Sequence, residues 1–218
     1  MPHPIKKEEW TLLFGRPPGT LLAKAIAKLP FKVHPNVVTM FSLSFMIIGA
    51  ICFFKNFLLL GAIFYILGLI FDCADGTLAR LTNTQSKFGE RLDFYCDTVG
   101  NVFMYFGLWY SQYYLIGEWF IGGSIIAAHY AVMVFGYMFL TSIMYKTVFK
   151  NIGSYYGPAD EGLITFFFLP IVAFFIPESF RWVFPILVIL QFISYLIIFV
   201  RQKEKPNIRE NIKKILKL

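Results

Sequence analysis

Four of the chain's five aspartates fall in one stretch, residues 72–97, which lies between two strongly apolar runs. Asp72 and Asp75 are three residues apart, and Asp93 and Asp97 are four apart, so each pair lies on one face of an α-helix. A charged residue at the centre of a membrane span costs about 2.5–3.5 kcal/mol, and intramembrane acids usually mark functional sites. Four of them this close together therefore indicate a site.

The segment between the two acidic helix faces, residues 81–88, is short and mostly polar. This predicts that the two helices run antiparallel as neighbours. With a rise of about 1.5 Å per residue, Asp72 and Asp97 each lie about 12 Å from the helix ends that this segment joins. Asp75 and Asp93 lie about 6–7.5 Å from the same ends. We therefore expect two facing tiers, Asp72 with Asp97 and Asp75 with Asp93.

Four carboxylates in one place repel each other, and their oxygen ligands suit Mg²⁺ or Mn²⁺ better than zinc. Two divalent cations would balance four negative charges, and such a pair is a common clamp for phosphoryl displacement. Gly76, Ala79 and Gly89 share the acidic faces and leave room for a phosphate to approach the backbone. Arg80 and Lys87 lie at the opening of this acidic site, and their positive charges can bind phosphate oxygens. The residues alone predict a two-metal transferase that acts on a phosphate-containing amphiphile.

The composition predicts that these helices lie in a membrane. Of 218 residues, 57% are hydrophobic and only 15% are charged, whereas a soluble domain usually has about 25% charged residues. This excludes the buried core of a soluble protein. We expect an all-α polytopic membrane protein with six transmembrane helices, since each apolar stretch has about the length that spans a bilayer. These stretches are residues 37–54, 57–80, 90–113, 119–145, 161–177 and 180–200.

The chain before the first span predicts an interfacial amphipathic helix, because apolar residues in TLLAKAIAKLPFK recur at helical spacing between lysines. We expect three parts along the chain: a cytoplasmic juxtamembrane segment (1–35), a six-helix transmembrane catalytic domain (36–200) and a basic cytoplasmic tail (201–218).

The basic residues predict the orientation. With both termini in the cytoplasm, 18 of the 20 Lys and Arg residues lie on the cytoplasmic side, and only Lys55 and Arg181 lie outside. The acidic site then also faces the cytoplasm. The net charge of +7 faces the anionic lipids of the inner leaflet, which argues against nucleic acid as a partner. We expect an integral protein of a prokaryotic plasma membrane.

The acidic stretch also matches a family signature. It resembles the pattern D-x2-D-G-x2-A-R-x8-G-x3-D-x3-D of the CDP-alcohol phosphotransferases, integral membrane enzymes, and the chain fills all eight fixed positions. These are Asp72, Asp75, Gly76, Ala79, Arg80, Gly89, Asp93 and Asp97. The six expected spans and the segment PNVVT (35–39), which resembles the family's start of the first span, agree with this resemblance.

The resemblance implies an activity and a set of roles. An acceptor alcohol attacks the β-phosphorus of a CDP-linked alcohol and CMP is released, with at least one of the two substrates a lipid. The donor we expect is a lipid like CDP-diacylglycerol, and the pathway is phospholipid biosynthesis. Asp72, Asp75, Asp93 and Asp97 hold two divalent metals, and Asp97 is also the general base. Family members are commonly homodimers. The nucleotide-binding residues are Asn36, Thr39, Gly76, Ala79, Arg80, Ser86 and Gly89.

The acceptor is left open by the sequence. A phosphate-bearing acceptor needs a basic pocket, which Lys87, Arg91, Lys146 and Lys150 could supply, and His129 is a further candidate for the pocket. The segment YYGPADEGL resembles part of the aminoalcohol phosphotransferases, which use CDP-choline or CDP-ethanolamine with diacylglycerol. A transferase of CDP-inositol or inositol phosphate is another alternative. A divalent-cation transporter, a different class, would also need intramembrane acids.

Overall fold

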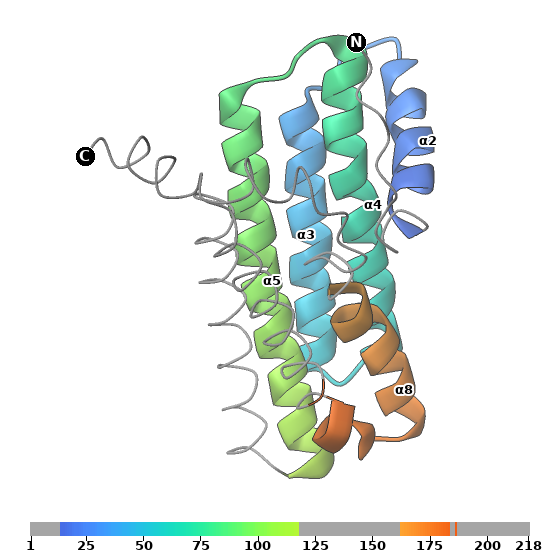
Figure 1. Cartoon of the computed structure of the whole chain (residues 1–218), viewed down its shortest axis with the longest axis vertical. Coiled ribbons are helices and arrows are strands. Elements are labelled where there is room, and N and C mark those ends of the chain that lie inside the picture. The colour runs from blue at the N-terminus through green and yellow to red at the C-terminus, as the bar shows by residue number, and fades with distance from the viewer. Residues whose placement is uncertain (1–13, 118–161, 184–185, 187–218) are drawn as a thin grey trace, which may run out of the picture.

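In the part of the chain that the computed structural model describes, residues 14–117, 162–183 and 186, all regular secondary structure is helical (Figure 1). The predicted all-α class is therefore confirmed for these residues. The elements are α2 (Arg16–Ala27), α3 (Pro35–Phe54), α4 (Leu58–Thr82), α5 (Lys87–Ile116), the π-helix η2 (Ile164–Phe168) and α8 (Leu169–Phe175).

Helices α3 and α4 are each long and apolar enough to cross a membrane. They coincide with the first two predicted spans, α5 covers the third, and η2 with α8 falls within the fifth. The fourth predicted span and most of the sixth lie outside the described residues. The six-span count, the side on which the termini lie and the division into three parts therefore stay predictions.

The connection between α4 and α5 follows from local signals in the sequence. Helix α4 ends at Thr82 and is followed by Asn83, which adopts the left-handed conformation (φ 54°) that commonly terminates helices. Helix α5 begins after Ser86, whose Oγ accepts a hydrogen bond from the Gly89 N–H at 3.0 Å. A serine in this position satisfies one of the N–H groups that a helix start leaves unpaired.

Helix α3 lies between α4 and α5 and packs along both, whereas α4 and α5 make few direct contacts with each other (Figure 1). The close approach depends on glycine. A Cβ added at Gly49 would lie 3.2 Å from the Gly61 carbonyl oxygen of α4, and one added at Gly107 of α5 would clash with the backbone of Ala50. The two acidic helices thus run antiparallel as predicted, but α3 separates them and they are not packed as direct neighbours.

The end of the bundle away from the α4–α5 connection is filled with aromatic side chains, and we call it the aromatic end. Here Phe166 of η2 packs against Tyr65 of α4 and Tyr105 of α5, with ring centroids 5.3 and 4.6 Å apart. All three side chains are buried in one cluster with Phe53 and Leu108. We call the opposite end, which carries the α4–α5 connection and the aspartates, the carboxylate end.

Helix α2 packs lengthwise against the carboxylate half of α4 (Figure 1). A Cβ added at Gly19 would lie 2.7 Å from the Cβ of Cys73, and Ala23 is buried in a cluster with Ala74 and Leu78. A helix is present where the sequence predicted one, but it is a packing partner of α4. Its predicted placement at the membrane interface stays a prediction.

Candidate active site

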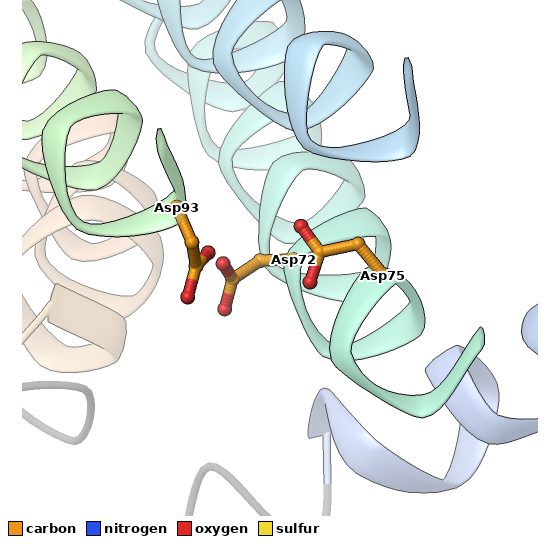
Figure 2. Close-up of side chains that lie close together, drawn as sticks. All are labelled: Asp72, Asp75 and Asp93. Carbon is orange, nitrogen blue, oxygen red and sulfur yellow. The ribbon is translucent and has the colours of Figure 1, made fainter. Parts of the chain in front are cut away.

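Three aspartates from two helices form the centre of the candidate site. Each of Asp72 and Asp75 on α4 and Asp93 on α5 offers a carboxylate oxygen, and these atoms all lie within 4.8 Å of one another (Figure 2). Asp75 is buried, with 5% of its surface exposed, and the other two are half-buried. Spacing on two helix faces thus brings these carboxylates together, as the sequence predicted.

Asp97 lies beside this cluster, one helical turn along α5 from Asp93. Its carboxylate interacts electrostatically with Asp93 and Asp75 and adjoins that of Asp72. The predicted tier of Asp72 with Asp97 is thus present. The second tier differs, because the Asp93 carboxylate lies against that of Asp72, and Asp72 stands between Asp93 and Asp75 in Figure 2. Asp72 is therefore next to both acids of α5.

The donor atoms fit a hard divalent cation. All are carboxylate oxygens, which Mg²⁺ and Mn²⁺ prefer. Mg²⁺–oxygen distances of about 2.1 Å separate opposite ligands by about 4.2 Å, close to the spread of the cluster. The Oδ1 atom of Asp93 is buried and has no hydrogen-bond partner among the described residues. A buried carboxylate oxygen without a partner is costly, and a cation at this position would remove that cost.

The start of α3 contacts both acidic helices. Thr39 donates a hydrogen bond to Asp75 of α4, with 2.5 Å between Oγ1 and Oδ2. At α5, a Cβ added at Gly89 would lie 3.2 Å from the Ser86 Oγ and 3.3 Å from the Asn36 Oδ1. Three of the predicted nucleotide-binding residues, Asn36, Ser86 and Gly89, therefore converge at the start of α5.

Gly76 and Arg80 lie on the acidic side of α4. Among the described residues, a Cβ added at Gly76 would meet only the Arg80 guanidinium, at 3.6 and 3.9 Å, so within this part of the chain one flexible side chain covers the backbone there. Arg80 is exposed and donates to the Thr77 hydroxyl at 3.2 Å. Ala79 is half-buried in the same turn. This surface of α4 can admit a phosphate group beside a guanidinium.

The predicted acceptor residues are described only in part. Lys87 and Arg91 are exposed on the first turns of α5, at the carboxylate end. His129, Lys146 and Lys150 lie outside the described residues, so their part in an acceptor pocket stays a prediction.

The contact between Thr39 and Asp75 was not anticipated from the sequence. The only signal for it is that Thr39 lies one helical turn after Pro35, at the start of an apolar helix. Sequence spacing relates residues within one helix, whereas this contact joins α3 to α4 across 36 positions. It depends on how two helices face each other.

The fold and the site together define a helical bundle with an all-carboxylate cluster between two of its helices. A family model described as CDP-alcohol phosphatidyltransferase matches residues 32–200. The chain belongs to this family, a membrane-embedded transferase family of phospholipid synthases. The family recognised from the acidic signature, and with it the prediction of a transferase, is thus confirmed.

Individual relatives agree with this assignment. The chain is 33% identical over 90 residues to a phosphatidylinositol phosphate synthase of Corynebacterium glutamicum. It is 32% identical over 85 residues to an uncharacterized protein of Aquifex aeolicus. These matches cover 40% and 38% of the chain and 41% and 43% of the relatives, so the chain spans about two fifths of the length of the curated relatives it matches.

A solved structure has the same fold. It is the crystal structure of phosphatidylinositol phosphate synthase from Mycobacterium tuberculosis with CDP-DAG bound. The match has a TM-score of 0.67 at 18% sequence identity and covers 87% of this chain and 96% of that one. At this identity the likeness establishes a shared fold.

Proposed function

We propose that the protein transfers a substituted phosphate group from a CDP-linked lipid to the hydroxyl group of an acceptor alcohol, with release of CMP. The observation that carries this proposal is the cluster of Asp72, Asp75 and Asp93 between α4 and α5, in a chain of the CDP-alcohol phosphatidyltransferase family. A donor like CDP-diacylglycerol is supported by the ligand named for the structural neighbour. An apolar bundle with its acids near one end suits a lipid donor and a polar acceptor.

Asp72, Asp75 and Asp93, together with Asp97, would hold two divalent cations, Mg²⁺ or Mn²⁺. Bound there, the cations would neutralise the diphosphate and stabilise charge that develops during displacement. Arg80 would contact phosphate oxygens that approach the backbone at Gly76. These assignments are supported by the oxygen-only donor set and by the absence of any side chain other than Arg80 over Gly76 in the described residues.

In the proposed reaction, Asp97 accepts the proton of the acceptor hydroxyl. The acceptor oxygen forms a bond to the β-phosphorus, and the bond from that phosphorus to the bridging oxygen of CMP breaks. CMP leaves with the electron pair of this bond. Asp97 suits this role because it lies beside the three-aspartate cluster and adjoins Asp72, where a carboxylate can be both ligand and base.

For the acceptor, we favour a phosphate-bearing polyol such as an inositol phosphate. The names of the Corynebacterium relative and of the structural neighbour support this choice. Lys87 and Arg91 are exposed at the carboxylate end, where they could bind a second phosphate. Aminoalcohol transfer to diacylglycerol is the competing hypothesis within the family.

We also infer that the carboxylate end faces the cytoplasm of a prokaryotic cell. Most of the basic residues in the described part lie in α2, in the turn before α3 or around the α4–α5 connection, all at this end, and Lys55 lies at the aromatic end. This distribution follows the positive-inside rule. Homodimer formation, implied by the family resemblance, stays a prediction.

The test is release of CMP by the full chain in lipid nanodiscs. CDP-diacylglycerol, CDP-inositol, CDP-choline and CDP-ethanolamine are each offered with candidate acceptors, with Mg²⁺, with Mn²⁺ and with EDTA. We expect metal-dependent release from CDP-diacylglycerol and its loss in Asp97→Asn, which keeps the side-chain shape. Metal flux into sealed vesicles without CMP release from any donor would instead support the cation transporter and reject this function.

A further inference from the structure

We propose that Thr39 is a positioning residue of the aspartate cluster and that its hydroxyl fixes the orientation of the Asp75 carboxylate for cation binding. This inference rests on the proposed function, because it concerns the cations that the cluster would hold. The family resemblance implied that Thr39 binds the nucleotide. The structure gives its hydroxyl a different partner, which lies within the cluster itself.

The geometry of the contact supports this role. The Thr39 Oγ1 lies 2.5 Å from the Asp75 Oδ2, within the range of strong hydrogen bonds from a hydroxyl to a carboxylate. Both residues are 5% exposed, so water does not compete for the bond. The other acceptor near this hydroxyl is the Pro35 carbonyl at 3.3 Å. A threonine has one hydroxyl hydrogen, and the nearer carboxylate takes it.

The bond has a specific consequence for Asp75. Rotation of a carboxylate about its last side-chain bond is only weakly restricted, so burial alone does not fix the plane of its oxygens. A donor held against Oδ2 fixes that plane, and with it the direction in which the carboxylate meets Asp72 and Asp93. Groups that orient metal ligands in this way commonly change metal affinity or activity 10–100-fold when they are removed.

Thr39 is itself held in a fixed position on α3. The helix starts at Pro35 and is capped by His34, whose Nδ1 accepts a hydrogen bond from the Asn36 N–H at 3.2 Å. Val38, next to Thr39, is 2% exposed and packs in the cluster between α2, α3 and α4. The donor is therefore attached to a packed helix start rather than to a mobile loop.

The same helix pair offers a matched control. Ser42 lies three residues after Thr39, is 2% exposed, and donates to the Gly68 carbonyl of α4 at 2.9 Å. It thus makes an equally buried hydroxyl bond between α3 and α4 that does not involve a carboxylate. Removal of either hydroxyl weakens helix packing, but only loss of the Thr39 hydroxyl should change the cluster.

The experiment measures binding of Mn²⁺ alone to the purified full chain, by the electron paramagnetic resonance signal of the free ion. For Thr39→Val we expect a 10–100-fold rise in the Mn²⁺ dissociation constant, whereas Thr39→Ser and Ser42→Ala stay within about threefold of the unmodified chain. Thr39→Ala is the second hydroxyl-free variant if Thr39→Val does not fold, and it has the same expected result. Thermal unfolding in detergent checks the fold of every variant.

Two results would overturn the proposal: unchanged Mn²⁺ affinity in a folded hydroxyl-free variant, or an equal loss of affinity in Ser42→Ala. If a hydroxyl-free variant binds Mn²⁺ normally but binds CDP more weakly at saturating Mn²⁺, Thr39 contributes to nucleotide binding and does not orient Asp75. These results are independent of the reaction assay. If Thr39→Val weakens Mn²⁺ binding while no CDP-alcohol yields CMP, the proposed function fails and the positioning role stands.

Discussion

The two ends of the bundle fill the space between α4 and α5 in different ways. At the aromatic end, Phe166 of η2 packs against Tyr65 on one helix and Tyr105 on the other. At the carboxylate end, the side chains that meet between the same two helices are aspartates (Figure 2). The comparison shows how the fold makes room for a site. Helix α3 separates α4 and α5, and η2 fills the gap at one end.

Glycines also have different surroundings at the two ends. At the aromatic end a Cβ on Gly107 would clash with the backbone of Ala50, so this glycine allows two helices to pack closely. At the carboxylate end a Cβ on Gly76 would meet, within the described part of the chain, only the flexible Arg80 side chain. The same residue type thus serves helix packing in one region and leaves accessible backbone in the other.

The largest effect is expected at the carboxylate end. Asp75→Asn keeps the shape of the side chain and an acceptor for Thr39 but removes one negative charge. We expect CMP release to fall about 10²–10³-fold, which corresponds to about 3–4 kcal/mol, because metal ligation contributes several kcal/mol to such reactions. The unfolding temperature should not fall, since one of four mutually repelling charges is lost. Retention of more than a third of the activity would argue against a metal-ligand role for Asp75.

The next largest effect is expected at the aromatic end. Phe166→Ala should reduce the free energy of unfolding by about 2 kcal/mol, less than the roughly 3–5 kcal/mol typical of soluble cores. The loss is smaller because lipid replaces water around an unpacked span, so mainly packing contacts are lost. Denaturant unfolding in detergent measures the change.

The control for this change is Phe168→Ala, whose side chain is 42% exposed, and it should cost much less. Mn²⁺ binding per folded molecule should be unchanged in Phe166→Ala, because the two ends have separate roles. Equal losses of stability in both variants would show that Phe166 does not fill the gap between α4 and α5.

The smallest effect is expected at Gly76. Gly76→Ala should raise the helix stability of α4 by up to about 1 kcal/mol, because Arg80 is the only described side chain that the added methyl group would meet. It should also weaken binding of CDP about tenfold, as one misplaced methyl group in a pocket commonly costs 1–3 kcal/mol. Thermal unfolding and calorimetric titration with CDP measure the two effects.

Gly107→Ala is the matched contrast at the aromatic end. It should leave CDP affinity unchanged and lower the free energy of unfolding by about 1–3 kcal/mol, the usual cost of overpacking. If Gly76→Ala lowers stability as much as Gly107→Ala does, the surface of α4 beside the aspartates is closely packed and cannot receive a phosphate.

The sequence predicted more of the candidate site than of the fold. The spacing of Asp72, Asp75 and Asp93 predicted their convergence, and the eight-residue signature predicted the family. The positions of α3, α4 and α5 also followed from their apolar lengths and from the short polar segment 81–88. All of these depend on residues close in the sequence, where helical geometry is regular enough to calculate.

The packing partners could not be predicted in the same way. Helix α3 is apolar on nearly all sides, so its composition does not indicate which faces meet α4 and α5. The lengthwise packing of α2 depends on the fit of Gly19 against Cys73, and a single glycine gives no sign of such a contact. The π-helical turn before Pro170, which accompanies the placement of Phe166, was not predicted either.

The sequence by itself determined which residues carry the chemistry, because the periodicity of a helix assigns side chains to faces without reference to any other element. Only the tertiary structure decided what surrounds those faces: α3 between the acidic helices, Phe166 across the aromatic end, and Thr39 against Asp75. Each of these is a contact between segments distant in the chain, and it depends on the shapes of two surfaces. The physical reason is that the geometry of a helix depends on residues close in the sequence, whereas packing depends on the surfaces of two elements together.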